Sequence, residues 1–296
     1  MAEDQSAPGA RGSNCSLFPS TILSEALDSG SGKLTQADRK SLHGSCARGV
    51  VVDPSSKHLY IAMARFDGSS GGEIQGFLIG TNGKLTELPG SPYLITGTPT
   101  GLAMHPTGNF IYVASDSGVV VIDRNTTSGA LLERGAFNSP KNHLAINPAG
   151  TFLAASERDS DEISQFFVDP NNGNIEALDF RPAASGPIGV AADPLRKFFA
   201  FTERLDTTTL AGGVSTFVLD SSTHQLVRTS EPVASGQGTV DLGFDPSGMF
   251  VYAANRQDGT VSGFTLNRDS GKLTPVSGSP FVSGDFPDSL IVVKPE

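Results

Sequence analysis

Hydrophobic and polar positions follow one another along the chain in short runs that return in the same order several times. The clearest copy covers residues 239–281 and reads TVDLGFDPSGMFVYAANRQDGTVSGFTLNRDSGKLTPVSGSPF. Two apolar runs flank an Asp-Pro-Ser-Gly turn, an alternating run follows an Asn-Arg loop, and a last run follows an Asp-Ser-Gly turn. Short runs rich in β-branched and aromatic residues, separated by such turns, predict four strands in each copy.

A proline closes the first strand of each copy, and these prolines recur every 42 to 52 residues. This spacing suits a four-stranded propeller blade of roughly 40–50 residues and is longer than helical repeats of about 34 residues. We therefore expect an all-β protein, a β-propeller whose blades are four-stranded antiparallel sheets. The prolines are Pro54, Pro106, Pro148, Pro194, Pro246 and Pro295.

Five whole blades are predicted, and within each we name the strands A to D in chain order. In the first blade these strands are expected at Gly49–Val52, Leu59–Met63, Glu73–Ile79 and Leu85–Leu88. The blades lie near residues 49–93, 101–140, 143–185, 188–235 and 240–283.

The two ends of the chain are expected to form one further blade together. Residues 21–35 align without a gap to residues 260–274, so they predict strands C and D, and Ser289–Val293 predicts a strand A. Closure of this kind buries the edges that an open ring would expose. Six blades are thus favoured, with seven as the alternative, in a single domain of 296 residues. The shared blade comprises 15–38 and 288–295, 1–20 is irregular, and Thr35–Ser45 is a loop or a helical turn.

Composition excludes several classes of partner. The formal net charge is −10 and no cluster of Lys and Arg is present, so a nucleic acid backbone would be repelled. No apolar run approaches the roughly 18 residues of a membrane helix, which predicts a soluble protein, and we expect a monomer.

Two cysteines bear on the compartment. Cys15 and Cys46 are either free thiols or a disulfide formed in an oxidising compartment, and a bridge would tie the closing blade to its neighbour. The first residues lack the apolar segment of a signal peptide, so either none exists or it has been removed. A secreted or periplasmic location is favoured over a cytoplasmic one. Asn14 and Asn125 begin glycosylation acceptor patterns.

The two faces of the predicted propeller differ. The A–B and C–D turns share one face and are regular, whereas the B–C and D–A loops share the other, vary in length and carry charge, which is where a scaffold usually places function. His143 is the one histidine in a D–A loop of the variable face. Beside carboxylates it is a candidate general acid or base, although an ordinary hydrogen-bonded loop histidine is the alternative.

Three strings, NPAGTFLAASERDSDEISQF, FFAFTERLDTTT and FVYAANRQDGTVSGFTLNRDSGKLTPVSGSPF, resemble the lactonase-family propellers, which include 6-phosphogluconolactonases and carboxymuconate-cyclising enzymes. The resemblance implies opening or closing of a small lactone without a metal, by a His, a Glu and arginines. His143, Glu203 and Arg256 are then the candidate catalytic residues. The candidate substrate-binding residues are Arg158, Asn255, Arg65 and Lys141.

The chain departs from the family pattern in ways that bear on activity. The Asn-Glu-Leu of the family is Thr202-Glu203-Arg204 here and is followed by an insertion at Asp206–Gly213. Asp161-Glu162 stands where the family has Asp-Arg.

Two other functions remain open. The long loops Arg65–Gly72 and Asp206–Gly213 suit a non-catalytic propeller that binds a protein or a glycan. Asp159, Asp161 and Glu162 offer oxygens to calcium, as expected of a calcium-dependent hydrolase similar to gluconolactonases. No cofactor is favoured, and calcium is the alternative.

Overall fold

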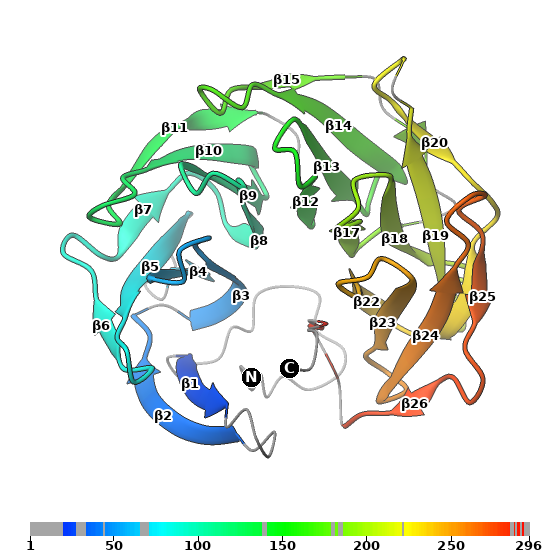
Figure 1. Cartoon of the computed structure of the whole chain (residues 1–296), viewed down its shortest axis with the longest axis horizontal. Coiled ribbons are helices and arrows are strands. Elements are labelled where there is room, and N and C mark those ends of the chain that lie inside the picture. Colours follow the sequence, from blue (N-terminus) through cyan, green and yellow to red (C-terminus); the bar gives the residue numbers. More distant parts are fainter. Residues whose placement is uncertain are drawn as a thin grey trace. The chain divides into compact units, whose positions relative to one another are not determined.

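A computed structural model provides the fold (Figure 1). It describes residues 20–27, 34–43, 45–65, 71–137, 141–178, 181–182, 186–220, 222–284, 287, 289–290 and 292. These residues form 26 β-strands and no helix, so the all-β prediction is confirmed for the described part of the chain. Accordingly, they include no helix long and apolar enough to cross a bilayer.

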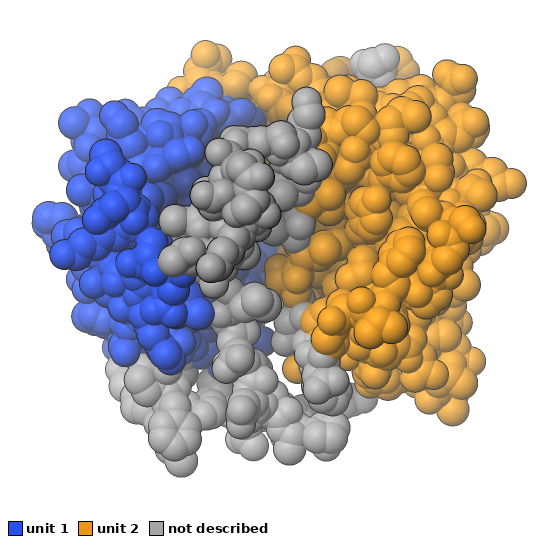
Figure 2. Space-filling model, turned by 60° about the horizontal axis from the view of Figure 1, so that its bottom comes forward, with its two compact units in different colours: residues 1–140, 296 blue, residues 141–295 orange. Residues whose placement is uncertain are grey.

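The chain divides into two compact units, drawn in blue and orange in Figure 2. Unit 1 comprises residues 1–140 and 296, and unit 2 comprises residues 141–295. The single domain expected from the sequence stays a prediction.

Unit 1 contains a hairpin and two larger antiparallel sheets. Each larger sheet runs in chain order from strand A to strand D, as the sequence predicted. The hairpin is β1 (Thr21–Leu27) and β2 (Leu34–Ser41). The first sheet is β3 (Ser45–Val52), β4 (His58–Ala64), β5 (Gly72–Ile79), β6 (Leu85–Glu87) and β7 (Tyr93–Ile95). The second is β8 (Pro99–Met104), β9 (Phe110–Ser115), β10 (Gly118–Arg124) and β11 (Leu131–Phe137).

Unit 2 contains three sheets of the same plan, and their A strands β12, β17 and β22 follow one another side by side in Figure 1. The first is β12 (Leu144–Ile146), β13 (Phe152–Glu157), β14 (Glu162–Val168), β15 (Ile175–Ala177) and β16 (Arg181–Pro182). The second is β17 (Val190–Ala192), β18 (Phe198–Arg204), β19 (Ala211–Leu219), β20 (Leu226–Arg228) and β21 (Val233–Gln237). The third is β22 (Thr239–Phe244), β23 (Phe250–Asn255), β24 (Thr260–Leu266), β25 (Leu273–Pro275) and β26 (Phe281–Val282).

The A–B turns explain the recurring Asp-Pro and Asn-Pro pairs. In β22–β23 the Asp245 carboxylate accepts the N–H groups of Met249 at 2.9 Å and Phe250 at 2.8 Å. Asn147 does the same with Thr151 and Phe152 through its amide oxygen. An Asp or Asn at this position closes the turn because its side chain mimics a backbone acceptor, so these regular turns are structural.

The outer strand is broken in four of the five larger sheets, which the sequence did not predict. In the first sheet β6 and β7 both pair with β5, separated by Leu88–Pro92. The interruption leaves the Gly76 N–H of β5 without a ladder partner, and the Ser91 hydroxyl accepts it at 3.1 Å. Ser279 accepts the Gly263 N–H in the same way at 2.9 Å. The serine of each Gly-Ser-Pro therefore replaces a lost backbone acceptor.

The core lies between successive sheets, with the B strands buried on both faces. In unit 2 one cluster joins Phe152 of β13 to Phe199 and Phe201 of β18, and a second joins Phe198 of β18 to Val251 of β23. Aromatic and branched side chains on both faces of the B strand fill the space between neighbouring sheets. This packing fixes where each B strand ends.

The N-terminal hairpin corrects one expectation. Residues 21–35 were predicted as strands C and D, and β1 and β2 do form an antiparallel pair. However, Thr35–Ser45 is not a loop or a helical turn, since β2 continues to Ser41 and β3 begins at Ser45. The Asp38 carboxylate accepts the Leu85 N–H at 2.9 Å, which attaches β2 to the sheet β3–β7. That contact between distant residues stabilises a strand whose polar sequence gave no strand signal.

The described part of the C-terminal segment lies along β22. The Ser289 hydroxyl and the Leu290 N–H both donate to the Asp241 carboxylate, at 3.0 and 2.8 Å. Residues 289, 290 and 292 are not in a strand, and the sheet of β1 and β2 contains no third strand among the described residues. The closing blade therefore stays a prediction, and 1–19 lies outside the described residues.

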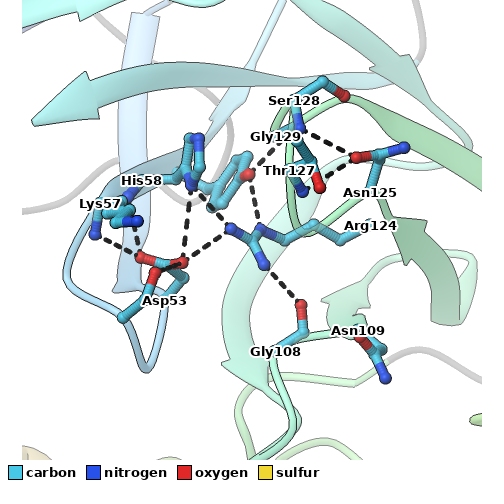
Figure 3. A network of polar contacts seen from close by, with 12 residues as sticks. Asp53, Lys57, His58, Gly108, Asn109, Arg124, Asn125, Thr127, Ser128 and Gly129 are labelled. Carbon is cyan, nitrogen blue, oxygen red and sulfur yellow. Dashed lines mark hydrogen bonds and ion pairs between the residues drawn. The ribbon is translucent and has the colours of Figure 1, made fainter.

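A buried ion pair joins the two larger sheets of unit 1 (Figure 3). Arg124 Nη2 lies 2.7 Å from Asp53 Oδ2, and the two side chains are 1% and 2% exposed. The same guanidinium donates Nε to the Tyr60 hydroxyl at 2.7 Å and Nη1 to the Gly108 carbonyl at 2.8 Å. Tyr60 in turn donates to the Gly129 carbonyl at 2.8 Å. Arg124 thus connects the A–B turn and the B strand of the first sheet to the A–B turn of the second sheet.

This network predicts a pH dependence of stability. Burial raises the pKa of Asp53, but hydrogen bonds from Ser55, His58 and Lys57 and the charge of Arg124 outweigh it and lower the pKa to about 2. A carboxyl with a depressed folded-state pKa adds stability above its unfolded pKa of about 3.9 and loses it as the pH falls toward the folded value. We expect about 2 kcal/mol of the free energy of unfolding to be lost between pH 4 and pH 2.

Urea denaturation across that range measures the loss, with Asp53→Asn as the comparison. The variant keeps an oxygen acceptor but does not titrate, so its stability should depend less on pH in this window. Equal pH dependence of the two proteins would contradict the assignment.

Candidate active site

In unit 2 the end of every B strand carries an acid or an amide followed by arginine. The pairs are Glu157-Arg158, Glu203-Arg204 and Asn255-Arg256, at the same position of β13, β18 and β23. The first member is buried in each case, with exposed fractions of 7%, 2% and 0%. Because side chains alternate along a strand, Arg204, the last residue of β18, points to the face of the sheet opposite Glu203, whereas Arg158 and Arg256 directly follow the ends of their strands. Sequence reasoning chose Glu203, Arg158 and Arg256 one by one, whereas alignment on the A–B turn reveals the repeat.

The strand register places these pairs at the same end of the sheet as the start of strand A. Leu144 pairs with Ala155, Val190 with Phe201 and Thr239 with Asn255. The loop before β12, which carries His143, therefore lies at the end where β13 and β18 carry their acids. Of the seven predicted site residues, six lie at this end of their own sheets in unit 2, namely Lys141, His143, Arg158, Glu203, Asn255 and Arg256.

The seventh, Arg65, directly follows β4 in unit 1 and is half-buried. It occupies the corresponding end of its own sheet, and its predicted role in substrate binding is not tested by that placement.

Glu203 is a buried carboxylate with a cation beside it. Its Oε1 accepts hydrogen bonds from the Ser215 hydroxyl and from Arg228 Nη2, the latter at 2.7 Å. The Arg228 guanidinium also lies over the Phe217 ring, 4.8 Å from its centroid. A charge can be buried in this way because it is paired and hydrogen-bonded. The arrangement fixes Glu203 and Arg228 as a unit at the end of β18.

Glu157 occupies the same position in the preceding sheet but has a different counter-ion. Its carboxylate accepts from Lys141 and Ser164 through Oε1 and from Ser160 through Oε2. Burial raises the pKa of Glu157, but the hydrogen bonds from Lys141 and Ser164 outweigh it, so the pKa lies below its ordinary value. Lys141 was predicted to bind substrate, and its side chain is 1% exposed.

The loop that carries His143 is fastened to the end of β13. The His143 N–H donates to the Ser156 hydroxyl at 3.1 Å, and the Ser156 N–H donates to the His143 carbonyl at 2.9 Å. Arg158 N–H donates to the Asn142 side chain at 2.7 Å. His143 is half-buried, so its ring lies at the surface of a fixed backbone rather than in the core.

Asn255 has all of its side-chain hydrogen-bonding capacity engaged within unit 2. Its Nδ2 donates to Thr260 and Ser262, and its Oδ1 accepts from Gly236 and Thr239, at distances of 2.9 to 3.0 Å. These contacts hold the loop before β22 against the end of β23. The next residue, Arg256, is half-buried and donates its N–H to the Gly238 carbonyl.

Two guanidinium nitrogens near Glu203 are buried without a hydrogen-bond partner, and sequence reasoning missed both. They are Arg204 Nε and Arg228 Nη1. Buried N–H donors are rarely left unpaired in native proteins, so each is a place where a ligand oxygen would be stabilised. The signal that could have found Arg204 is its replacement of the leucine in the Asn-Glu-Leu pattern.

The described residues do not gather a group of three or more His, Cys, Asp or Glu side chains able to hold a metal ion. In the loop proposed for calcium, the Asp161 carboxylate accepts the Gly186 N–H. Calcium binding there stays a prediction.

Two cavities of unit 1 lie away from every predicted site residue. They have volumes of about 470 and 400 Å³, and both are lined by Leu131 and Leu132 of β11. Neither contributes to the candidate active site.

Antiparallel sheets that repeat with their strands in chain order are the architecture of propeller blades. The sequence model described as "Lactonase, 7-bladed beta-propeller" matches residues 99–192 and 188–285, so the chain belongs to this lactonase family. The family description names seven blades, the count that the proline spacing left as the alternative. That description does not support the six blades favoured from the sequence, and the described residues contain five sheets of this plan and one hairpin.

Individual relatives agree with the family. The chain is 24% identical to a 6-phosphogluconolactonase of Pectobacterium carotovorum over 244 residues, which cover 78% of this chain and 70% of the relative. It is 24% identical to a 6-phosphogluconolactonase of Yersinia pseudotuberculosis over 176 residues, which cover 55% of this chain and 51%, about half, of the relative. The solved structure of the periplasmic gluconolactonase of Pseudomonas aeruginosa has a TM-score of 0.75 at 16% identity, covering 90% of this chain and 79% of that protein, and shows a shared fold.

Proposed function

We propose that this protein is a lactonase that hydrolyses a small sugar lactone. Family membership and two relatives named 6-phosphogluconolactonase support the reaction class. The observation that carries the proposal is that His143, the buried Glu203 and the arginines 158 and 256 all lie at the corresponding end of their own sheets in unit 2.

His143 is the group best suited to move the proton. Glu203 is almost fully buried and its Oε1 already accepts from Ser215 and Arg228, so it is poorly placed to contact a water molecule or a substrate. A half-buried imidazole on a fixed loop can take a proton from water near neutral pH. Glu203 then serves to hold Arg228, and the two are positioning groups of the site.

The reaction follows from these roles. His143 takes a proton from a water molecule whose oxygen attacks the lactone carbonyl carbon. The ring C–O bond then breaks, the ring oxygen takes the proton back from His143, and a hydroxy acid leaves. Arg256 and Arg158 hold the anionic groups of the substrate through forked hydrogen bonds. In this scheme no step uses a metal ion.

A lactone panel assayed with and without chelator tests the proposal. The panel contains glucono-δ-lactone, 6-phosphoglucono-δ-lactone and muconolactone. We expect hydrolysis of at least one sugar lactone well above its spontaneous rate, by about a hundredfold or more, and no effect of chelator. Activity lost with the chelator and restored by calcium would favour the calcium-dependent hydrolase. No acceleration of any lactone would favour a binding protein.

We further propose that the protein works in an oxidising compartment. Cys46 is disulfide-bonded, and such bonds persist outside the cytosol; Cys15 lies outside the described residues. The periplasmic location named for the Pseudomonas gluconolactonase agrees with this. Fractionation of the source cells tests it, and recovery of the protein in the cytosol would overturn it.

A further inference from the structure

Arg204 lies at this end of unit 2 and has no role in the proposed reaction. It ends β18 immediately after Glu203, and its Nε is buried without a hydrogen-bond partner. None of the ion pairs among the described residues includes it. A guanidinium stays protonated at every physiological pH, so this unpaired donor belongs to a full positive charge.

Gly186 determines where that guanidinium lies. A Cβ at this position would overlap Arg204 Nη2 and stand 3.1 Å from both Cζ and Nε. The Gly186 backbone has a φ of +46°, a left-handed conformation that favours glycine. Its N–H donates to the Asp161 carboxylate, so the glycine is held from the other side by the B–C turn of the preceding sheet. The Arg204 guanidinium therefore occupies space that a side chain at position 186 would fill.

A second arginine occupies the equivalent position in the preceding sheet. Arg158 directly follows β13, where Arg204 is the last residue of β18, and it is exposed. Arg228 is a poorer candidate for a ligand, because it is already the counter-ion of Glu203 and stacks on Phe217. Arg204 is therefore the cation with an unpaired buried donor beside Gly186.

We propose that Arg204 determines substrate specificity by donating its buried Nε–H to an anionic oxygen of the lactone, in a phosphate or a carboxylate group. This inference rests on the proposed lactonase function. The hydrogen bond from Arg204 makes the site select an anionic sugar lactone over a neutral lactone with the same ring. A charge-assisted hydrogen bond from a guanidinium to an anionic oxygen is roughly twice as strong as one between neutral groups.

Steady-state kinetics with 6-phosphoglucono-δ-lactone and glucono-δ-lactone test the selectivity. Arg204→Gln should lower the ratio of the two kcat/KM values by about tenfold, since a charge-assisted hydrogen bond to the anion is lost while the neutral substrate is little affected. Arg196→Gln is the matched control, because Arg196 is an exposed arginine in the A–B turn at the opposite end of the same sheet. It removes the same charge and should leave the ratio within about twofold.

Gly186→Ala provides a second variant that keeps every charge. The new methyl group displaces the far end of Arg204, so the ratio should fall as in Arg204→Gln although the protein is still folded by circular dichroism. An unchanged ratio in both variants would overturn the proposal.

Binding measurements keep the test independent of turnover. Isothermal titration with 6-phosphogluconate, D-glucarate and gluconate should show about tenfold weaker binding of an anionic probe to Arg204→Gln than to the wild-type protein, with gluconate unaffected. If the variant binds only 6-phosphogluconate more weakly, the group that Arg204 contacts is a phosphate. If it binds only D-glucarate more weakly, that group is a carboxylate at the same end of the sugar. If the wild-type protein hydrolyses no lactone, the proposed function fails, while weaker binding of either probe still supports the anion site. Equal binding to both proteins would refute it.

Discussion

Replacing His143 with asparagine is expected to reduce kcat on the hydrolysed lactone by about a hundredfold or more, because general acid–base catalysis contributes roughly 10²–10⁴. KM should change little, since the arginines that hold the substrate are untouched. The loop is fastened through its backbone to Ser156, so the substitution should leave the fold intact. Stopped-flow or pH-stat hydrolysis assays give both constants.

His224→Asn is the matched control for this experiment. His224 is exposed in the C–D turn between β19 and β20, at the opposite end of the sheet, and its φ of 56° suits asparagine. The control should keep full activity. A His143→Asn variant within about threefold of the wild-type rate would remove His143 from the proposed chemistry.

Replacing Arg124 with methionine is expected to lower the free energy of unfolding by about 3–5 kcal/mol, because it leaves the Asp53 carboxylate buried without its cation. The substitution also removes the donors to Tyr60 and to the Gly108 carbonyl. Methionine keeps much of the side-chain volume, so the loss reports on charge and hydrogen bonding rather than on a cavity. Urea denaturation followed by circular dichroism measures it.

Arg134→Met supplies the comparison within the same sheet. Arg134 pairs with Asp123, but these side chains are 32% and 35% exposed, and exposed ion pairs contribute only about 0–1 kcal/mol. The double variant Asp53→Asn with Arg124→Met should recover part of the loss, since no unpaired charge remains buried. If Arg124→Met and Arg134→Met lower the free energy of unfolding equally, the buried network contributes no more to stability than an exposed ion pair.

Local patterns sufficed for most of the fold, because strands and turns here depend on nearby residues. Asp245 and Asn147 close their A–B turns within five residues, and the predicted strands of the first sheet match β3 to β6 to within a few residues. What the pattern could not predict depends on contacts between distant residues. The polar strand β2 is stabilised by Leu85, and the break after β6 is compensated by Ser91.

The candidate site was predictable only in part. The resemblance to the lactonases indicated Glu203, yet its partner Arg228 lies in β20, 25 residues later, at a distance that no motif covers. Lys141 illustrates the opposite case. It was predicted to bind substrate as a charged residue of the variable face, and the structure adds that its side chain is buried against Glu157. A sequence identifies a charged residue, but it does not tell whether that side chain is exposed to water or buried against another side chain.

The interrupted outer strands also affect how the folded protein meets other copies of itself. A long, flat run of free backbone N–H and C=O groups is a template for fibril growth, and pieces of two to five residues are poor templates. Four of the five larger sheets end in such pieces, as β6 and β7 do. In the exception, β11, the φ of Gly135 is +153° and the register shifts opposite β10, which bends the strand. The outer edges of the described larger sheets therefore offer little backbone on which another copy of the chain could add a strand.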